Sequence, residues 1–89
     1  MREFEIKPEL EKKLVKLSKK NKVRYEAVMN KIQEVITSGD IGHYKNLRYD
    51  MKDSKRVQLG HFVLVFSYDK GRDFVTFEDY DHHDKIYVE

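Results

Sequence analysis

The chain has 89 residues, and we expect residues 1–89 to form a single domain, because this length is just sufficient to bury a core. It contains no cysteine, which excludes disulfides and thiolate metal sites, and no apolar run approaches the roughly 18 residues that cross a membrane. The net charge of +2 is uneven: residues 1–60 hold fifteen Lys or Arg against nine Asp or Glu, and residues 61–89 hold three against seven. The basic part favours a polyanionic partner, and the N-terminus lacks the apolar run of a signal peptide, so we expect a cytoplasmic protein.

The N-terminal part predicts one strand followed by two helices. Arg2–Ile6 alternates charged and apolar residues, as a short strand does when one face is buried. Pro8 suits the first turn of a helix that closes at Lys19–Lys22, and leucines recur in it at helical spacing. A second helix is predicted from about Val23 to Ile36, shortly before a glycine. Two amphipathic helices joined by a short turn form an antiparallel helical hairpin with one apolar side.

The segment Asp40–Ser54 is the least regular part of the chain. It has apolar residues that could anchor it to the core, namely Ile41, Leu47, Tyr49 and Met51. Its other large side chains are expected to face outward: Tyr44, Lys45, Arg48 and Lys52.

The strongest pattern lies in residues 55–69. Lys55–Leu59 alternates between apolar and polar residues, whereas Phe62–Tyr68 begins with five apolar residues in a row, which suits a strand covered on both faces. Gly60 lies between them, where a tight hairpin turn needs a residue that can adopt positive φ. A second turn at Asp69–Arg72 leads to a third strand, Phe74–Asp81.

These elements predict an α+β fold of order β-α-α-β-β-β, in which the helical hairpin packs on an antiparallel meander sheet. The strand covered on both faces, Phe62–Tyr68, is expected in the middle, flanked by Phe74–Asp81 and by the N-terminal strand Arg2–Ile6. We expect the tail Asp84–Glu89 to pack against the edge of the sheet.

The densest group of potentially reactive side chains follows the last strand, in the run EDYDHHDKIY. Three interpretations stay open. The run could be an ordinary polar strand end, or it could bind zinc, manganese or iron, although adjacent histidines on an extended segment point to opposite sides. In the third interpretation, His82 or His83 moves protons without a metal ion. Asp81 or Asp84 would then fix the tautomer, and Tyr87 would donate a hydrogen bond.

Polar side chains on or before the first hairpin strand would lie near this tail if the sheet is ordered as predicted: Lys52, Lys55, Arg56 and Gln58. Cations combined with histidine suit RNA cleavage, because the cations hold the scissile phosphate while histidine handles the protons and the ribose 2′-hydroxyl attacks. Each cation could equally be an ordinary solvated surface residue.

Two motifs follow each other in the second half of the chain. Arg56–Phe66 is a basic alternating strand, a glycine and an apolar strand, and Asp81–Tyr87 is a histidine cluster followed by an aliphatic residue and tyrosine. A leucine-containing stretch, Asn46–Arg48, precedes them. With the order strand, helical hairpin and meander, these motifs resemble the RelE/ParE superfamily of toxins from type II toxin–antitoxin pairs, and in particular its RelE-like branch in archaea and bacteria. The resemblance covers nearly the whole chain.

This resemblance implies an endoribonuclease that cleaves mRNA in the ribosomal A site without a cofactor or metal and that is neutralised by a cognate antitoxin. It implies catalytic roles for His83, His82, Tyr87 and Arg56. His83 is our first choice because it lies closer to Tyr87, and His82 would then be structural. The candidates for holding RNA or phosphate are Arg48, Lys52, Lys55, Gln58 and Lys85.

Two other functions stay open. A ParE-like protein would poison gyrase and would not be a nuclease, although the pair of histidines favours the nuclease. A degenerate module would bind an antitoxin without catalysis. Gln58 and Val63 favour this last possibility, because they stand where the family usually has cations.

Overall fold

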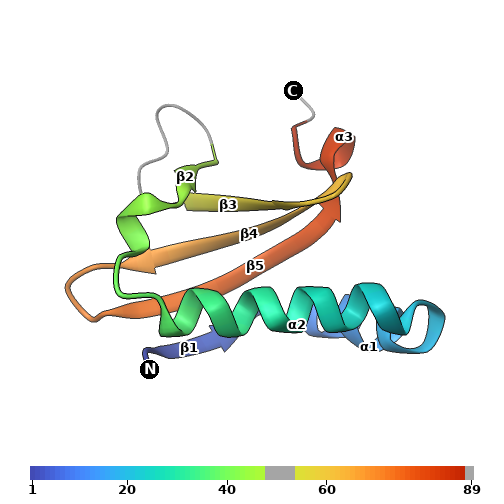
Figure 1. The fold of residues 1–89 in the computed structure, drawn as a ribbon, viewed down its shortest axis with the longest axis horizontal. Helices are drawn as coiled ribbons and strands as arrows, with labels where there is room; N and C mark the ends of the chain where they lie inside the picture. Colours follow the sequence, from blue (N-terminus) through green and yellow to red (C-terminus); the bar gives the residue numbers. More distant parts are fainter. Residues whose placement is uncertain (48–53, 88–89) are drawn as a thin grey trace.

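The computed structural model describes residues 1–47 and 54–87. The chain forms a five-stranded mixed sheet with two long helices along one face, which confirms the predicted α+β class (Figure 1). The helices are α1 (Pro8–Lys20), α2 (Lys22–Thr37) and the short α3 (His83–Ile86), and the strands are β1 (Glu3–Ile6), β2 (Lys45–Asn46), β3 (Ser54–Leu59), β4 (Phe62–Asp69) and β5 (Phe74–His82). Within the described ranges, no helix is both long and apolar enough to cross a membrane.

The sheet has the strand order β1-β5-β4-β3-β2. β3, β4 and β5 form the predicted antiparallel meander, and Gly60 has a φ of 65° in the turn between β3 and β4. The prediction that the N-terminal strand flanks the central strand is wrong, because β1 pairs in parallel with β5, with Ile6 opposite Phe77. The two hairpins already occupy both edges of β4, so β1 can join the sheet only beside an outer strand, and it pairs with β5. β2, a two-residue strand beside β3, has no counterpart in the sequence prediction.

A single residue, Asn21, separates the two long helices. Its backbone N–H donates to the carbonyl oxygen of Leu17, which closes α1, and its side-chain oxygen accepts from the N–H of Arg24 at 3.1 Å, which caps α2. α1 and α2 therefore lie side by side against the sheet (Figure 1), and their apolar side chains pack into one core. The buried residues of this core include Leu10, Leu14, Val28, Ile32, Val35 and Ile36 of the helices and Leu64, Phe66, Val75, Phe77 and Tyr80 of the strands.

The central strand β4 is buried on both faces, as its run of apolar residues predicts. Leu64 and Phe66 point into the core beneath the helices and are fully buried. Val63 and Val65 point to the opposite face, where their exposed fractions are only 0% and 5%. α3 contacts β4 and β5 and stands on the side of the sheet away from the long helices (Figure 1). The C-terminal tail therefore packs at the end of the sheet, close to the β3–β4 turn.

β5 contains one extra residue relative to β4. Val65 lies opposite Asp79, while the next residue of β4 lies opposite Phe77, so Glu78 has no partner and forms a β-bulge. Side chains alternate between the two faces of a strand, and the extra residue shifts this alternation by one position. As a result Phe77 and Tyr80, three positions apart, both point into the core.

Tyr44 corrects the prediction for the segment after α2. A 3₁₀ turn, η1 (Ile41–His43), buries Ile41 as predicted, but Tyr44, which was expected to face outward, is only 7% exposed. Its ring meets Phe66 edge-on, with 5.5 Å between ring centroids, and its hydroxyl donates to Glu34 Oε2 at 2.9 Å. The prediction failed because the partner that lets this tyrosine be buried lies on α2, ten residues earlier.

Replacing Tyr44 by phenylalanine should lower the free energy of unfolding by about 1 kcal/mol at neutral pH, because the hydrogen bond to Glu34 is lost. Burial, together with this bond and the charge of Glu34, raises the pKa of Tyr44 from 10.0 to about 12. Since the folded-state pKa is raised, the stabilisation by the hydroxyl is complete below pH 10 and is lost as the pH rises towards 12. Urea unfolding at increasing pH should therefore show a shrinking difference between wild type and Tyr44→Phe. A difference that stays constant through alkaline pH would contradict this assignment.

Candidate functional site

The candidate site lies on the face of the sheet opposite to α1 and α2. In the β3–β4 register Arg56 is opposite Val65 and Gln58 is opposite Val63, and neighbours across a sheet point to the same side. We call this surface the tail face, and its strand residues are Arg56, Gln58, Val63 and Val65. The alternation predicted for β3 is thus confirmed, with Val57 and Leu59 directed to the core.

His83, Tyr87 and Arg56 come together over the tail face. The ring centroids of His83 and Tyr87 are 4.7 Å apart, and the guanidinium carbon of Arg56 is 5.9 Å from the centroid of the Tyr87 ring. α3 makes this arrangement possible, because residues four apart lie on the same side of a helical turn. The N–H of Tyr87 closes that turn by donating to the carbonyl oxygen of His83 at 3.2 Å. An imidazole, a phenol ring and a cation from two distant parts of the sequence therefore share one surface.

His82 has a different environment from its neighbour. Its Nδ1 accepts a hydrogen bond from the backbone N–H of Asp84 at 3.2 Å, so this side chain caps the start of α3. Its ring meets Phe62 edge-on at 5.5 Å and stacks on His61 at 6.2 Å, measured between ring centroids. The two side chains are similarly exposed, 42% for His82 and 49% for His83, so it is the capping role of His82 and not its accessibility that distinguishes the pair.

Of the two carboxylates considered as partners of the histidines, Asp84 is the nearer to His83, with 3.6 Å between Oδ1 and Nδ1. Asp81 instead pairs with Lys13 of α1, with 3.0 Å between Oδ2 and Nζ. Burial alone would raise the pKa of Asp81, but the hydrogen bonds from Lys13 and from the backbone of His82 lower it below its ordinary value. Asp81 therefore stays ionised and ties the end of β5 to α1, just before the tail begins.

The hydroxyl of Tyr87 is buried and has no hydrogen-bond partner among the residues that the structure describes. Leaving a buried hydroxyl unpaired is unfavourable, in contrast to the paired hydroxyl of Tyr44. Because this atom is buried, it can donate to a bound phosphate only after α3 shifts. α3 has only four residues, so such a shift would disturb few backbone hydrogen bonds.

One cation of the tail face was missed by the sequence analysis. β2 sets the exposed Lys45 directly opposite Arg56, so both side chains point to this face. A two-residue strand gives no periodic pattern from which this pairing could be predicted. Gln58, in contrast, bends back to its own turn, where Nε2 donates to the carbonyl oxygen of Gly60 at 3.0 Å. Lys85 is exposed on α3, two positions after His83.

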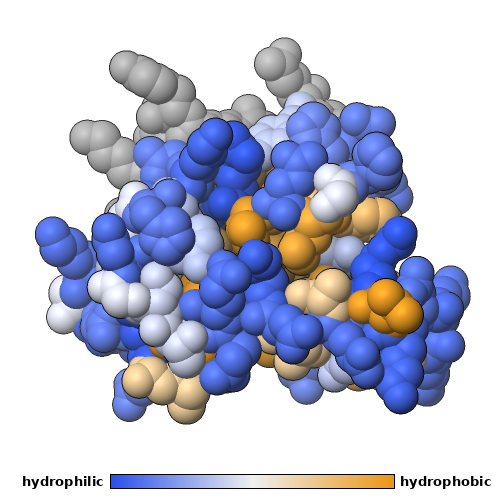
Figure 2. All heavy atoms as spheres, in the orientation of Figure 1, coloured by the Kyte–Doolittle hydropathy of each residue, from blue (hydrophilic) through white to orange (hydrophobic). Residues whose placement is uncertain are grey.

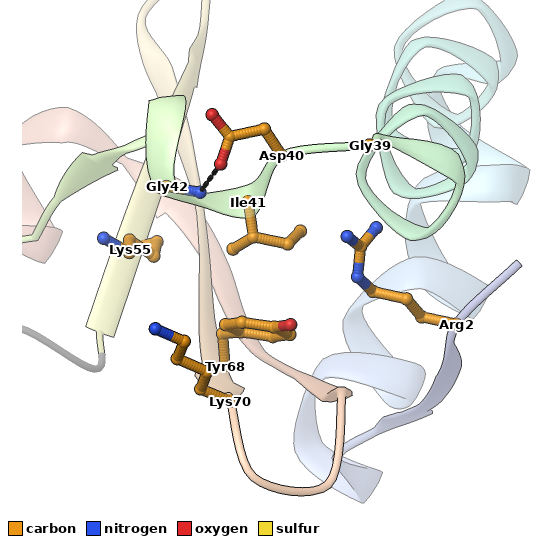
Figure 3. A pocket seen from close by; sticks show the side chains of 8 residues that line it. All are labelled: Arg2, Gly39, Asp40, Ile41, Gly42, Lys55, Tyr68 and Lys70. Atoms are coloured by element: carbon orange, nitrogen blue, oxygen red, sulfur yellow. Dashed lines mark hydrogen bonds between the residues drawn. The ribbon is translucent and has the colours of Figure 1, made fainter.

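Lys55 lies on the other face of β3 from Arg56. Its side chain lines a hollow of about 340 Å³, together with Arg2 and Lys70. Figure 3 shows these cations reaching the hollow from different elements, around the ring of Tyr68. The structure therefore does not bring Lys55 to the tail face, and Lys55 and Arg56 cannot hold the same phosphate group.

Two further candidates, Arg48 and Lys52, lie outside the described residues. Within residues 1–47 and 54–87, no group of three or more His, Asp or Glu side chains is arranged to hold a metal ion. The adjacent histidines point to different neighbours, His82 towards Phe62 and His83 towards Tyr87.

Comparisons with known proteins identify the family of the chain. No protein-family model matches the chain. The protein named "Putative toxin RelE4" of Methanocaldococcus jannaschii is 47% identical over 88 residues, which cover 98% of this chain and 92% of the relative. Two solved structures share the fold, each over 92% of this chain. The isolated E. coli RelE toxin has a TM-score of 0.74 at 19% identity over 84% of its length, and the toxin–antitoxin complex RelBE2 from Mycobacterium tuberculosis has 0.63 at 20% identity over 91%. The identity to the archaeal relative confirms the resemblance found in the sequence, and the chain belongs to the RelE family of toxins.

Proposed function

We propose that this chain is an endoribonuclease that cleaves mRNA on the ribosome by metal-free acid–base catalysis, and that a cognate antitoxin keeps it silent in the cytoplasm. The observation that carries the proposal is the convergence of His83, Tyr87 and Arg56 on the tail face. The family, and the cation Lys45 opposite Arg56, support it.

In the proposed reaction the ribose 2′-oxygen bonds to phosphorus while the bond from phosphorus to the 5′-oxygen breaks. The 2′-hydroxyl loses a proton and the 5′-oxygen gains one, and the imidazole of His83 moves these protons. Arg56 stabilises the negative charge that develops on the phosphoryl oxygens, and Tyr87 positions the reacting group. The products are a 2′,3′-cyclic phosphate and a 5′-hydroxyl end.

The proposed antitoxin has the support of one structural neighbour, since the Mycobacterium tuberculosis protein was solved as a toxin–antitoxin complex. The sheet of this chain also has an edge that a partner strand could extend, because β1 pairs with β5 on one side only. A partner that also covers α3 would hide His83, which is half exposed.

Expression of the chain should arrest growth, and purified protein should cut mRNA on ribosomes to leave 2′,3′-cyclic phosphate ends. Co-expression with the adjacent small reading frame should restore growth and yield a stoichiometric complex on affinity purification. Linear phosphate ends would contradict attack by the 2′-hydroxyl. Normal growth with uncut mRNA would contradict the nuclease itself.

A module that binds an antitoxin without cleaving RNA is the second candidate function. Gln58 is hydrogen-bonded to its own turn and Val63 is fully buried, so neither position supplies a positive charge to the tail face. Formation of the stoichiometric complex by a protein that neither arrests growth nor cleaves mRNA would favour this candidate.

A further inference from the structure

A second surface lies at the opposite side of the β3–β4 turn from the tail face. Here the first turns of α2 and the tips of β3 and β4 enclose an open hollow of about 460 Å³, which we call the α2 groove. Apolar side chains, including Val28, Leu59 and Phe62, line it, and Val23 at its rim is 79% exposed. Figure 2 shows hydrophobic side chains gathered on this face between α2 and the hairpin. Clustered exposed apolar side chains often mark a binding surface.

The wall of the α2 groove contains a polar group that the protein does not satisfy. Tyr80 is only 5% exposed, and its hydroxyl is buried without a hydrogen-bond partner among the described residues. Burial raises the pKa of this phenol, while the nearby charge of Arg24 acts in the opposite direction. The phenol therefore keeps its proton, and its hydroxyl is a buried donor that no described group of the chain accepts. As at Tyr87, a ligand in the groove reaches this hydroxyl only after the surrounding wall shifts.

Stacked groups stand beside this hydroxyl. The rings of Tyr80 and Phe62 lie nearly parallel, at 16° and 5.2 Å between centroids, and the guanidinium carbon of Arg24 is 4.2 Å from the centroid of the Phe62 ring. Among the described residues, no carboxylate lines the groove. The surface therefore combines flat apolar walls, a hydroxyl donor and a cation, a combination that favours a planar ligand rich in acceptors and joined to an anion.

The α2 groove is connected to the candidate catalytic residues by the hairpin turn. His61 lines the groove, and its carbonyl oxygen accepts a hydrogen bond from the N–H of His83 at 2.8 Å. The rings of His61 and His82 are 6.2 Å apart and nearly parallel. A strand of RNA that crosses the tail face at His83 could therefore continue around the turn.

We propose that the α2 groove binds a nucleobase of the RNA that flanks the cleaved bond, with its face against the apolar wall and its edge accepting from Tyr80. This inference rests on the proposed nuclease function. An aliphatic side chain from a protein partner would fill the same space but would leave the Tyr80 hydroxyl unpaired, whereas a base carries ring and carbonyl acceptors. Arg24 would then meet the adjoining phosphate.

The test uses the His83→Ala protein, in which cleavage is expected to be slow, with ¹³C-labelled tyrosine and a short single-stranded RNA. The NMR signal of Tyr80 is identified by its loss in a Tyr80→Phe variant. Normal RNA should shift this signal, and an abasic oligomer with the same phosphates should not. Tyr80→Phe should weaken RNA binding about three- to tenfold without lowering the melting temperature, because it removes a hydroxyl that the free protein leaves unpaired.

Arg72→Leu is the matched control for Arg24→Leu. Arg72 likewise lies over a phenylalanine, at 4.6 Å from the Phe74 ring centroid, but it belongs to the turn at the far end of β4 and β5. We expect Arg24→Leu to weaken RNA binding and Arg72→Leu to leave it unchanged. Equal shifts with abasic RNA, an unmoved Tyr80 signal, or variants that weaken only antitoxin binding would overturn the inference. Cleavage by the wild-type protein is measured in a separate assay. If that protein cleaves mRNA while the Tyr80 signal does not move, base binding in the α2 groove is rejected and the proposed nuclease function stands.

Discussion

Replacing His83 by alanine should lower the rate of mRNA cleavage on ribosomes by about 10²–10⁴-fold, the usual effect of removing an acid–base group. The reason is geometric, because the imidazole of His83 stands beside Tyr87, whereas that of His82 caps α3. The exposed position of His83 means that the fold should keep its stability, so the loss should appear in the rate and not in the melting temperature. Single-turnover cleavage, measured with a chelator that spares magnesium, gives this rate directly.

Two other histidines provide matched controls for this experiment. His82→Asn keeps a side-chain acceptor that can cap α3, and it should reduce cleavage far less than His83→Ala. His43→Ala removes an exposed histidine of η1 and should have no effect. A full loss in His82→Asn with an active His83→Ala would move the chemistry to His82. Recovery of activity on addition of zinc or manganese would contradict a metal-free reaction.

Leu64→Ala should lower the free energy of unfolding by about 2–5 kcal/mol, a large share of the stability of so small a domain. Leu64 is fully buried in the middle of the central strand, between Val57 of β3 and Tyr80 of β5. Alanine would remove its contacts with both neighbours and leave a cavity that the close-packed core cannot easily refill. Urea unfolding followed by circular dichroism measures the change.

Leu17→Ala is the comparison for this substitution, since it makes the same chemical change at a half-buried position of α1. It should lower the free energy of unfolding by less than half as much, because fewer contacts are lost and alanine favours the helix. Similar melting temperatures for the two variants would show that β4 is not the centre of the core.

The fold could be predicted well from the sequence where local patterns carry the information. The alternation of β3, the apolar run of β4 and the turn at Gly60 are properties of adjacent residues, and they gave the meander correctly. The place of β1 could not be predicted, because pairing with β5 depends on which sheet edge remains free. Tyr44 was misassigned because its burial also depends on a non-local contact, the hydrogen bond to Glu34 ten residues earlier.

The candidate site was predicted in part. The convergence of Arg56 with Tyr87 follows from alternation on β3 and from the motif at the tail, and the structure brings these residues together. Lys45 was not predicted as part of this surface, because a two-residue strand is too short to show an alternating pattern. Lys55 was grouped with Arg56, although neighbours along a strand point to opposite faces. Which face of the sheet a residue lies on was therefore predicted better from the alternation along the strand than from closeness in sequence.

The bulge at Glu78 shifts by one residue the alternation of side chains between the two faces of β5. Before it, odd-numbered residues such as Phe77 enter the core; after it, even-numbered ones such as Tyr80 do. One unpaired residue therefore fixes the face of the sheet on which the tail begins. Without it, the side chains of β5 after the bulge would point to the opposite face. Substitutions at Glu78 can therefore leave the facing of the tail intact, whereas deletion of this one residue would reverse it.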